Sequence, residues 1–64
     1  MPSTQRWNAL AQVAHAAVQT AIEEMENYYD DRTEEWQESD RAADLEARTE
    51  LFTEALASLD VLLT

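Results

Sequence analysis

Apolar residues recur along the first half of the chain at the spacing of one helix face. Between Trp7 and Tyr28 the steps between apolar residues are three or four positions, the period at which side chains share a face of an α-helix. This pattern predicts a helix over about residues 4–29, in which Ser3 or Thr4 accepts the first free backbone N–H groups. The predicted face consists of Trp7, Leu10, Ala14, Ala17, Ala21, Met25 and Tyr28, and Ala11, Val18 and Ile22 widen it.

A second helical pattern occupies the last part of the chain. Ser39 is a favourable helix-capping residue, and Asp40 follows it where the helix dipole favours a carboxylate. These signals predict a second helix over about residues 40–62. Its predicted apolar face consists of Leu45, Phe52, Ala55, Leu56, Leu59, Leu62 and Leu63, with Ala42, Ala43 and Leu51 at the margins.

Residues 30–39 interrupt both patterns and predict a bend. The run from Asp31 to Glu34 loosely fits a capping box, and Thr33 as the cap is the alternative. Either is expected to start a single helical turn over about residues 33–37. Trp36 in this turn is expected to fold over the end of the hairpin, or else to act as a binding hot spot, where tryptophan is enriched. Its expected neighbours are Tyr28 or Tyr29 and Leu45.

Two such helices joined by a short connection predict a single all-α domain over residues 1–64, folded as an antiparallel hairpin. The chain has no glycine and no cysteine, so neither a glycine turn nor a disulfide contributes. Two helices alone leave apolar surface uncovered, and we therefore expect two hairpins to form a homodimeric four-helix bundle. A monomeric hairpin that docks on another protein is the runner-up. The expected dimer interface consists of Trp7, Leu10, Ala14, Ala17, Phe52, Leu56, Leu59 and Leu63.

Negative charge gathers around the predicted bend. The chain has 14 acidic and 4 basic residues, a net charge of −10, of which residues 23–46 contribute −9. Such a field attracts basic surfaces and repels nucleic acids and anionic membranes. The sequence therefore predicts a basic protein partner and no direct binding of nucleic acid or membrane, although the acids can also serve solubility alone. The expected protein-binding surface consists of Glu23, Glu24, Asp30, Asp31, Glu34, Glu35, Trp36 and Glu38.

No residue pattern indicates catalysis, a cofactor or a metal site. His15 is expected on the flank of the first helix, because the nearest acid along the chain, Glu23, is two turns away. Gln12 stands where a di-iron bundle needs a glutamate three residues before the histidine. No apolar run approaches the roughly 18 residues of a membrane span, and no signal peptide is visible. We therefore expect a soluble, cytoplasmic protein without enzymatic activity.

The stretch from Asp31 to Arg41, DRTEEWQESDR, resembles the bend of a set of small acidic helical proteins from phages and integrative or conjugative elements. In those proteins an acidic and aromatic stretch leads into Asn-x-Pro-Glu-x-Leu-Gln-x-Ser-Glu-Arg and a second helix. Thr33 stands here in place of the proline and Trp36 in place of the leucine. The resemblance covers about residues 28–60 and implies a helical hairpin without catalytic residues. The matching residues are Glu34, Gln37, Ser39 and Arg41.

Two functions are consistent with this sequence. The first is an acidic protein-interaction module from a mobile element, for example a nucleic-acid mimic that inhibits a basic DNA-binding protein. The alternative is a structural or assembly protein that acts through its apolar helix faces. Salt distinguishes them, because binding between charged surfaces weakens with ionic strength and apolar association does not.

Overall fold

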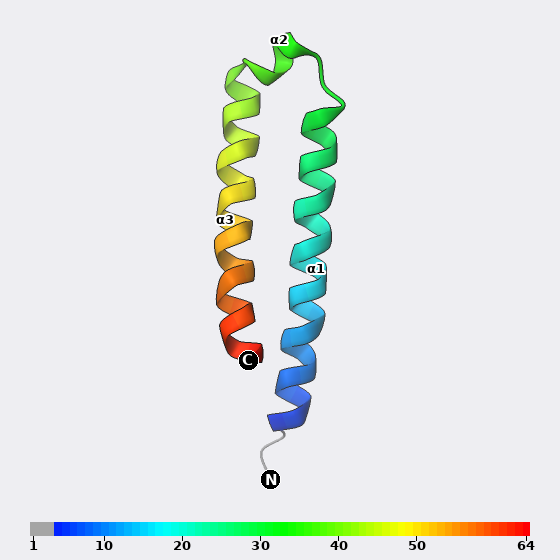
Figure 1. The fold of residues 1–64 in the computed structure, drawn as a ribbon, viewed down its shortest axis with the longest axis vertical. Coiled ribbons are helices and arrows are strands. Elements are labelled where there is room, and N and C mark those ends of the chain that lie inside the picture. Colours follow the sequence, from blue (N-terminus) through cyan, green and yellow to red (C-terminus); the bar gives the residue numbers. More distant parts are fainter. Residues whose placement is uncertain (1–3) are drawn as a thin grey trace.

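The computed structural model describes residues 4–64, which form two long helices and one short helix (Figure 1). Helix α1 spans Thr4–Asp30, α2 spans Glu34–Gln37 and α3 spans Asp40–Leu63. The predicted all-α class is confirmed, and the predicted ends of both long helices are correct to within one residue. Ser3, which was expected to share the start of the first helix, lies outside the described residues.

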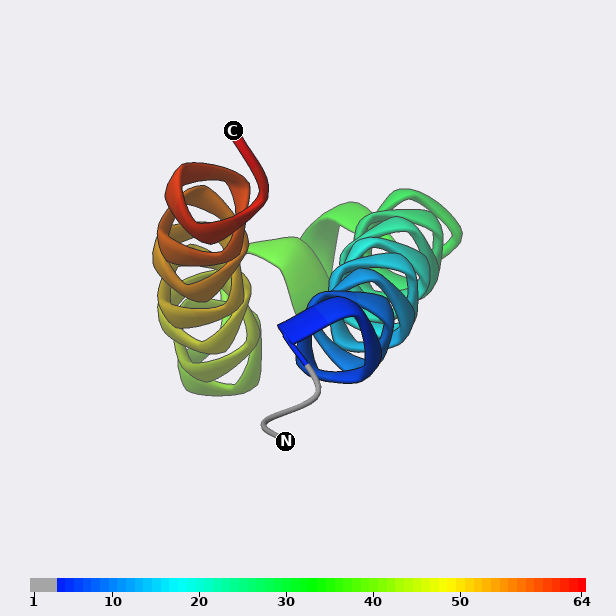
Figure 2. The same ribbon diagram turned by 90° about the horizontal axis from the view of Figure 1, so that it is seen from below.

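The two long helices lie side by side and run in opposite directions, with α2 joining them at one end (Figure 1). Seen along their length, they form one layer of two helices (Figure 2). The molecule measures 55 × 16 × 16 Å. Each helix therefore packs against one neighbour, and both broad sides of the layer face solvent.

The contact between the two long helices follows a strict alternation of three and four residues, which we call the seam. Every α3 residue that is not exposed belongs to this repeat, which begins at the buried Ala42. On α1 the same repeat accounts for all the partly or fully buried residues except Ala21. This 3–4 spacing is that of antiparallel helices that pack knobs into holes. The seam consists of Ala11, His15, Val18, Ile22, Met25 and Tyr29 on α1 and Ala42, Leu45, Thr49, Phe52, Leu56, Leu59 and Leu63 on α3.

The apolar face predicted for the first helix is wrong by about one residue position. Ile22, expected at the margin, is the buried residue of α1, whereas Leu10, Ala14 and Ala17 are exposed. α1 is apolar over a wide sector, and the bulkier Val18 and Ile22 pack against α3 in preference to the alanines. Trp7 is also exposed, because α1 begins beyond the end of α3 (Figure 1).

The face predicted for the second helix is mostly confirmed. Five of its residues lie in the seam, but Ala55 and Leu62 are exposed. Ala42, predicted at the margin, is only 1% exposed and is the most buried residue of the described chain. Ala42 lies in the first turn of α3, next to the bend, where α2 also packs against α3. The small side chain allows this close approach.

The bend is built by extended residues and side-chain hydrogen bonds. Thr33 is the N-cap of α2 and its Oγ1 accepts a 3.3 Å bond from the Trp36 N–H, so the second of the two predicted caps is the one that forms. Ser39 is the N-cap of α3, as predicted, but its hydroxyl donates to the Trp36 carbonyl instead of capping α3. The Gln37 side-chain amide donates 2.9 Å to the Tyr29 carbonyl and 3.3 Å to the Arg32 carbonyl. Gln37 thus satisfies carbonyl groups at and just beyond the end of α1, where many helices use a glycine.

Aromatic rings close this end of the hairpin. The Trp36 ring lies 5.6 Å from the Tyr28 ring and 6.2 Å from the Tyr29 ring, centroid to centroid, both edge to face. Such pairs contribute about 0.5–1.5 kcal/mol beyond the area they bury. The predicted packing of Trp36 against the tyrosines is confirmed. The Arg32 guanidinium lies 4.4 Å from the centre of the Tyr28 ring and partly shields this ring from solvent.

Candidate interaction surfaces

The acidic residues predicted to bind a partner are all exposed, and they come from several elements. Asp30 ends α1, Asp31 follows it, and Glu34 and Glu35 form the first turn of α2. Glu38 is exposed at the end of α2. These five carboxylates therefore crowd into the few residues of the bend.

The other predicted contact residues stand apart from this group. Glu23 and Glu24 lie about two turns before the end of α1, roughly 10 Å from the bend along the helix axis. They are neighbours in sequence, so they point about 100° apart around the helix. Trp36 is half-buried against the tyrosines. The predicted surface is thus one acidic bend and two outlying acids, and its tryptophan mainly supports the bend.

The charge of the acidic bend is not neutralised by neighbouring arginines. Over residues 4–64 the close contact between a basic and an acidic side chain joins His15 to Asp60, far from the bend. Arg32, the base closest in sequence, lies over the Tyr28 ring. The last turn of α1 has no basic residue, so the carboxylates there also face the negative end of the helix dipole. The bend consequently carries a dense group of exposed negative charges.

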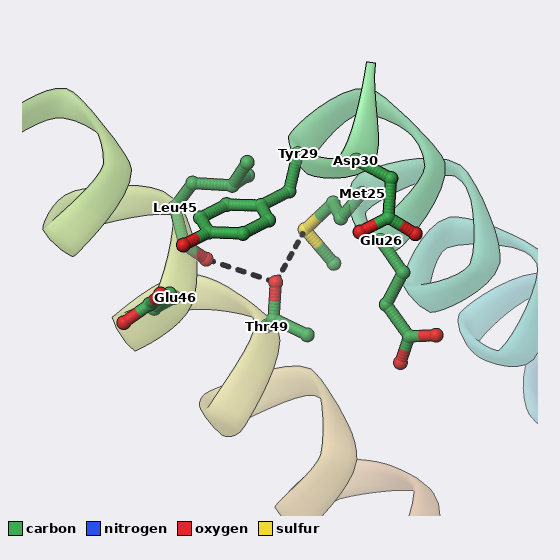
Figure 3. A pocket seen from close by; sticks show the side chains of 7 residues that line it. All are labelled: Met25, Glu26, Tyr29, Asp30, Leu45, Glu46 and Thr49. Carbon is green, nitrogen blue, oxygen red and sulfur yellow. Dashed lines mark hydrogen bonds between the residues drawn. The ribbon is translucent and has the colours of Figure 1, made fainter. Parts of the chain in front are cut away.

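An open pocket of about 350 Å³ lies between α1 and α3 next to the bend (Figure 3). Met25 and Leu45 give it apolar walls, and the Thr49 hydroxyl donates a 2.9 Å bond to the Leu45 carbonyl. Its carboxylates come from both helices. Asp30 belongs to the predicted binding surface, but Glu26 and Glu46 do not, because these two residues, 20 positions apart, meet only after folding. The lining residues are Met25, Glu26, Tyr29, Asp30, Leu45, Glu46 and Thr49.

The pKa of the Tyr29 phenol is raised from its ordinary value. Partial burial is the largest cause, followed by the hydrogen bond to Glu46 and the negative charges of Glu46 and Asp30. The folded state therefore favours the neutral phenol, and the stability this provides is present below about pH 10 and is lost as the pH rises through the raised pKa. We expect the melting temperature to fall as the pH passes about 10, and to fall less for Tyr29→Phe, measured by circular dichroism. Tyr28→Phe is the matched control, and an equally steep fall in Tyr29→Phe would contradict the prediction.

His15 is not the flank residue that the sequence predicts. It occupies a seam position, and its Nε2 lies 2.5 Å from Oδ1 of Asp60 on α3. The expectation for His15 depended on acids near it along the chain, whereas Asp60 lies 45 residues away in the sequence. The contact joins α1 to α3 near the open end of the hairpin.

The residues predicted to form a dimer interface divide into two groups. Trp7, Leu10, Ala14 and Ala17 are exposed on α1. The α3 members lie in the seam and are partly covered by α1 within the same chain. These residues pack inside the hairpin and stay only partly covered, so their role in a dimer interface remains a prediction. The α3 members are Phe52, Leu56, Leu59 and Leu63.

Large apolar side chains remain exposed on both long helices. Val61 is 77% exposed and Val13 is 67% exposed. A contiguous group of such residues marks an association surface, whereas scattered ones do not. The other exposed large side chains are Trp7, Leu10, Tyr28, Leu51 and Leu62.

Comparison with known proteins gives no family for this chain: no protein-family model, no curated protein and no solved structure matches it. Among the described helices none is both long enough and apolar enough to cross a membrane. Within residues 4–64 no three histidine, aspartate or glutamate side chains are placed to hold a metal ion together.

Proposed function

We propose that the protein is a non-enzymatic interaction module whose acidic bend binds a basic surface on another protein. The observation that carries this proposal is the group of exposed carboxylates from Asp30 to Glu38, which no arginine neutralises. Charges of one sign that are held together without partners inside the chain favour a partner of opposite charge. The rigid aromatic cluster beneath them holds the acidic bend in one shape.

One form of this function is nucleic-acid mimicry. A basic DNA-binding cleft recognises regularly spaced phosphates, and carboxylates held on a rigid helical end present a similar negative field. The partner is then a DNA-binding protein whose cleft the acidic bend occupies. The resemblance of residues 28–60 to hairpin proteins of phages and integrative or conjugative elements agrees with this form and remains a prediction.

The pocket beside the bend extends the proposed surface. Its apolar walls suit the methylene stem of a lysine or arginine, and the carboxylates of Glu26, Asp30 and Glu46 suit the charged head. A basic side chain of the partner therefore fits between α1 and α3 at this position.

The alternative function is structural, with the apolar helix faces as the active surface and the acids as solubilising groups. The exposed Leu10, Leu51 and Leu62 favour it. The two functions are compatible in one molecule, since the same hairpin can form a dimeric four-helix bundle and still present two acidic bends. The two functions differ in whether binding of a basic partner depends on the position of the acidic residues or only on their number.

Two double variants with the same net charge test the position of the acids. Glu34→Lys with Glu35→Lys changes the bend, and Glu50→Lys with Glu54→Lys changes exposed acids of α3 away from it. The probe is a synthetic oligo-arginine peptide, titrated by calorimetry at low and high salt. We expect the bend variant to weaken binding about tenfold or more, equivalent to about 1.4 kcal/mol, and the α3 variant to weaken it much less.

The same titrations decide between the two functions. For the unaltered protein we expect the affinity for the peptide to fall steeply as salt is added. Equal losses in the two variants, each shown by circular dichroism to be helical, would mean that only total charge matters. That result would overturn the proposed function and favour the structural one.

A further inference from the structure

We propose that two copies of this chain stack through one broad side of the hairpin, with their acidic bends at opposite ends of the dimer. The surface that each copy contributes, which we call the apolar face, is formed by Leu10, Ala14 and Ala17 on α1 and by Leu51, Ala55 and Leu62 on α3. All six are exposed in the single hairpin.

These residues share one side of the layer because of their place in the repeat. Each of them immediately precedes a seam residue, as Ala14 precedes His15 and Ala55 precedes Leu56. A step of one residue rotates a side chain by about 100° around its helix. Since α1 and α3 run in opposite directions, the same sense of rotation on both helices leads to the same broad side of the layer (Figure 2).

The opposite broad side has a different character. The residues that immediately follow seam positions are mostly polar or acidic, for example Gln19, Glu26 and Glu50. The pocket carboxylates and Asp60, the partner of His15, belong to this side. The exposed leucines of the described chain, Leu10, Leu51 and Leu62, therefore lie on the first side and not on this one.

The accessible surface of the hairpin is larger than that of a compact monomer of the same mass, as expected for one subunit of a dimer. The hairpin has an accessible surface of 5258 Å². A compact monomer of 7.3 kDa exposes about 4,200 Å². The excess is roughly 1,000 Å² per chain, close to the about 800 Å² that each partner contributes to a standard interface. A second hairpin on the apolar face covers about this much, and the alanines allow its helices to approach closely.

Charge selects the arrangement of the two copies. Four charged residues interrupt the apolar face in its bend half, whereas the open half contains one polar residue, Ser58, and no charged one. The more apolar part of the face therefore lies toward the open end. The four charged residues are Glu24, Arg41, Asp44 and Arg48. Two copies that overlap their apolar parts in parallel bring both acidic bends together, and the like charges repel. The antiparallel overlap keeps the same apolar contact and separates the bends.

The antiparallel arrangement also places opposite charges at the same height. If the twofold axis passes near Ala14 and Ala17, Arg6 of one copy and Glu24 of the second copy each lie about 13 Å from it along α1. Both side chains are exposed. In a parallel arrangement Arg6 instead lies level with Arg6 of the second copy, and Glu24 lies level with Glu24 of the second copy.

Two adjacent alanines give a matched test of the apolar face. Ala17 lies on this face, whereas Ala16 follows the seam residue His15 and lies on the opposite broad side, and both are exposed. We expect Ala17→Glu to shift the dimer dissociation constant upward by at least about a hundredfold, measured by sedimentation equilibrium, with the hairpin still helical. Ala16→Glu is expected to leave the constant within about threefold of the original. Equal effects of the two variants, or a monomer before any substitution, would overturn the proposal.

The orientation is measured separately with a spin label. The protein has no cysteine, so Glu35→Cys introduces one unique attachment point on the acidic bend. Two labels at opposite ends of the antiparallel dimer lie about 50 Å apart, from the rise of 1.5 Å per residue. We expect double electron–electron resonance to measure a distance of about 50 Å between the two labels. A distance of about 25 Å or less would place the bends together and overturn the proposed orientation.

Discussion

Replacing Ala42 by glutamate is expected to lower the free energy of unfolding of the hairpin by about 3 kcal/mol or more. Ala42 is 1% exposed and lies where the first turn of α3 meets the bend, so a larger charged side chain has no space and no partner there. An unpaired buried charge costs roughly 3 kcal/mol or more. A chain of 64 residues has a total stability of about 3–10 kcal/mol, so this loss is a large part of it. The measurement is urea unfolding followed by the helical circular-dichroism signal.

Ala43→Glu is the matched control for this prediction. Ala43 is the next residue of the same helix turn and is exposed, so the same substitution changes the same net charge and the same helix-dipole interaction. We expect its free energy of unfolding to stay within about 0.5 kcal/mol of the original. Similar stability of the two variants would mean that Ala42 is not buried, and the described packing at the bend would be wrong.

Replacing Ile22 by alanine is the second large effect that we expect. Ile22 is 9% exposed, and it is the other buried apolar residue besides Ala42 in the described chain. Removing a buried isoleucine side chain beyond Cβ costs about 2–5 kcal/mol. We expect a loss of about 2–3 kcal/mol, at the low end, because a layer of two helices can relax around the gap. The free energy of unfolding in urea measures it.

Val13→Ala controls for the loss of an aliphatic side chain on the same helix. Val13 is 67% exposed and lies outside the seam and outside the apolar face. Its replacement is expected to change the free energy of unfolding by no more than about 0.5 kcal/mol. If Val13→Ala proves as costly as Ile22→Ala, the seam of α1 is assigned to the wrong residues.

The helices and the bend could be predicted from the sequence because their signals are local. Three- and four-residue spacing predicted both long helices, and Thr33 predicted the turn between them. Trp36 could be placed against the tyrosines because all three belong to one short stretch of chain. Each of these predictions depends on residues within a few positions of one another.

The pairing of the two helices could not be predicted in the same way. α1 is apolar over a sector wide enough for two neighbours, so its sequence alone does not say which part meets α3. The His15 contact with Asp60 depends on the register between helices, which no local spacing contains. The carboxylates of the pocket, Glu26 and Glu46, meet for the same reason. The acidic bend, by contrast, could be predicted as a charged surface, because its charges are adjacent in the sequence.

The most direct test of the arrangement described here is the mass of the unaltered protein in solution. In the proposed arrangement the apolar face binds a second copy, the acidic bend binds a basic partner, and the two surfaces are separate. Light scattering across a dilution series, at low and at high salt, is expected to give a mass twice that of the chain at both salts. A helical protein that is monomeric throughout the series would contradict self-association and leave the apolar face to a different protein.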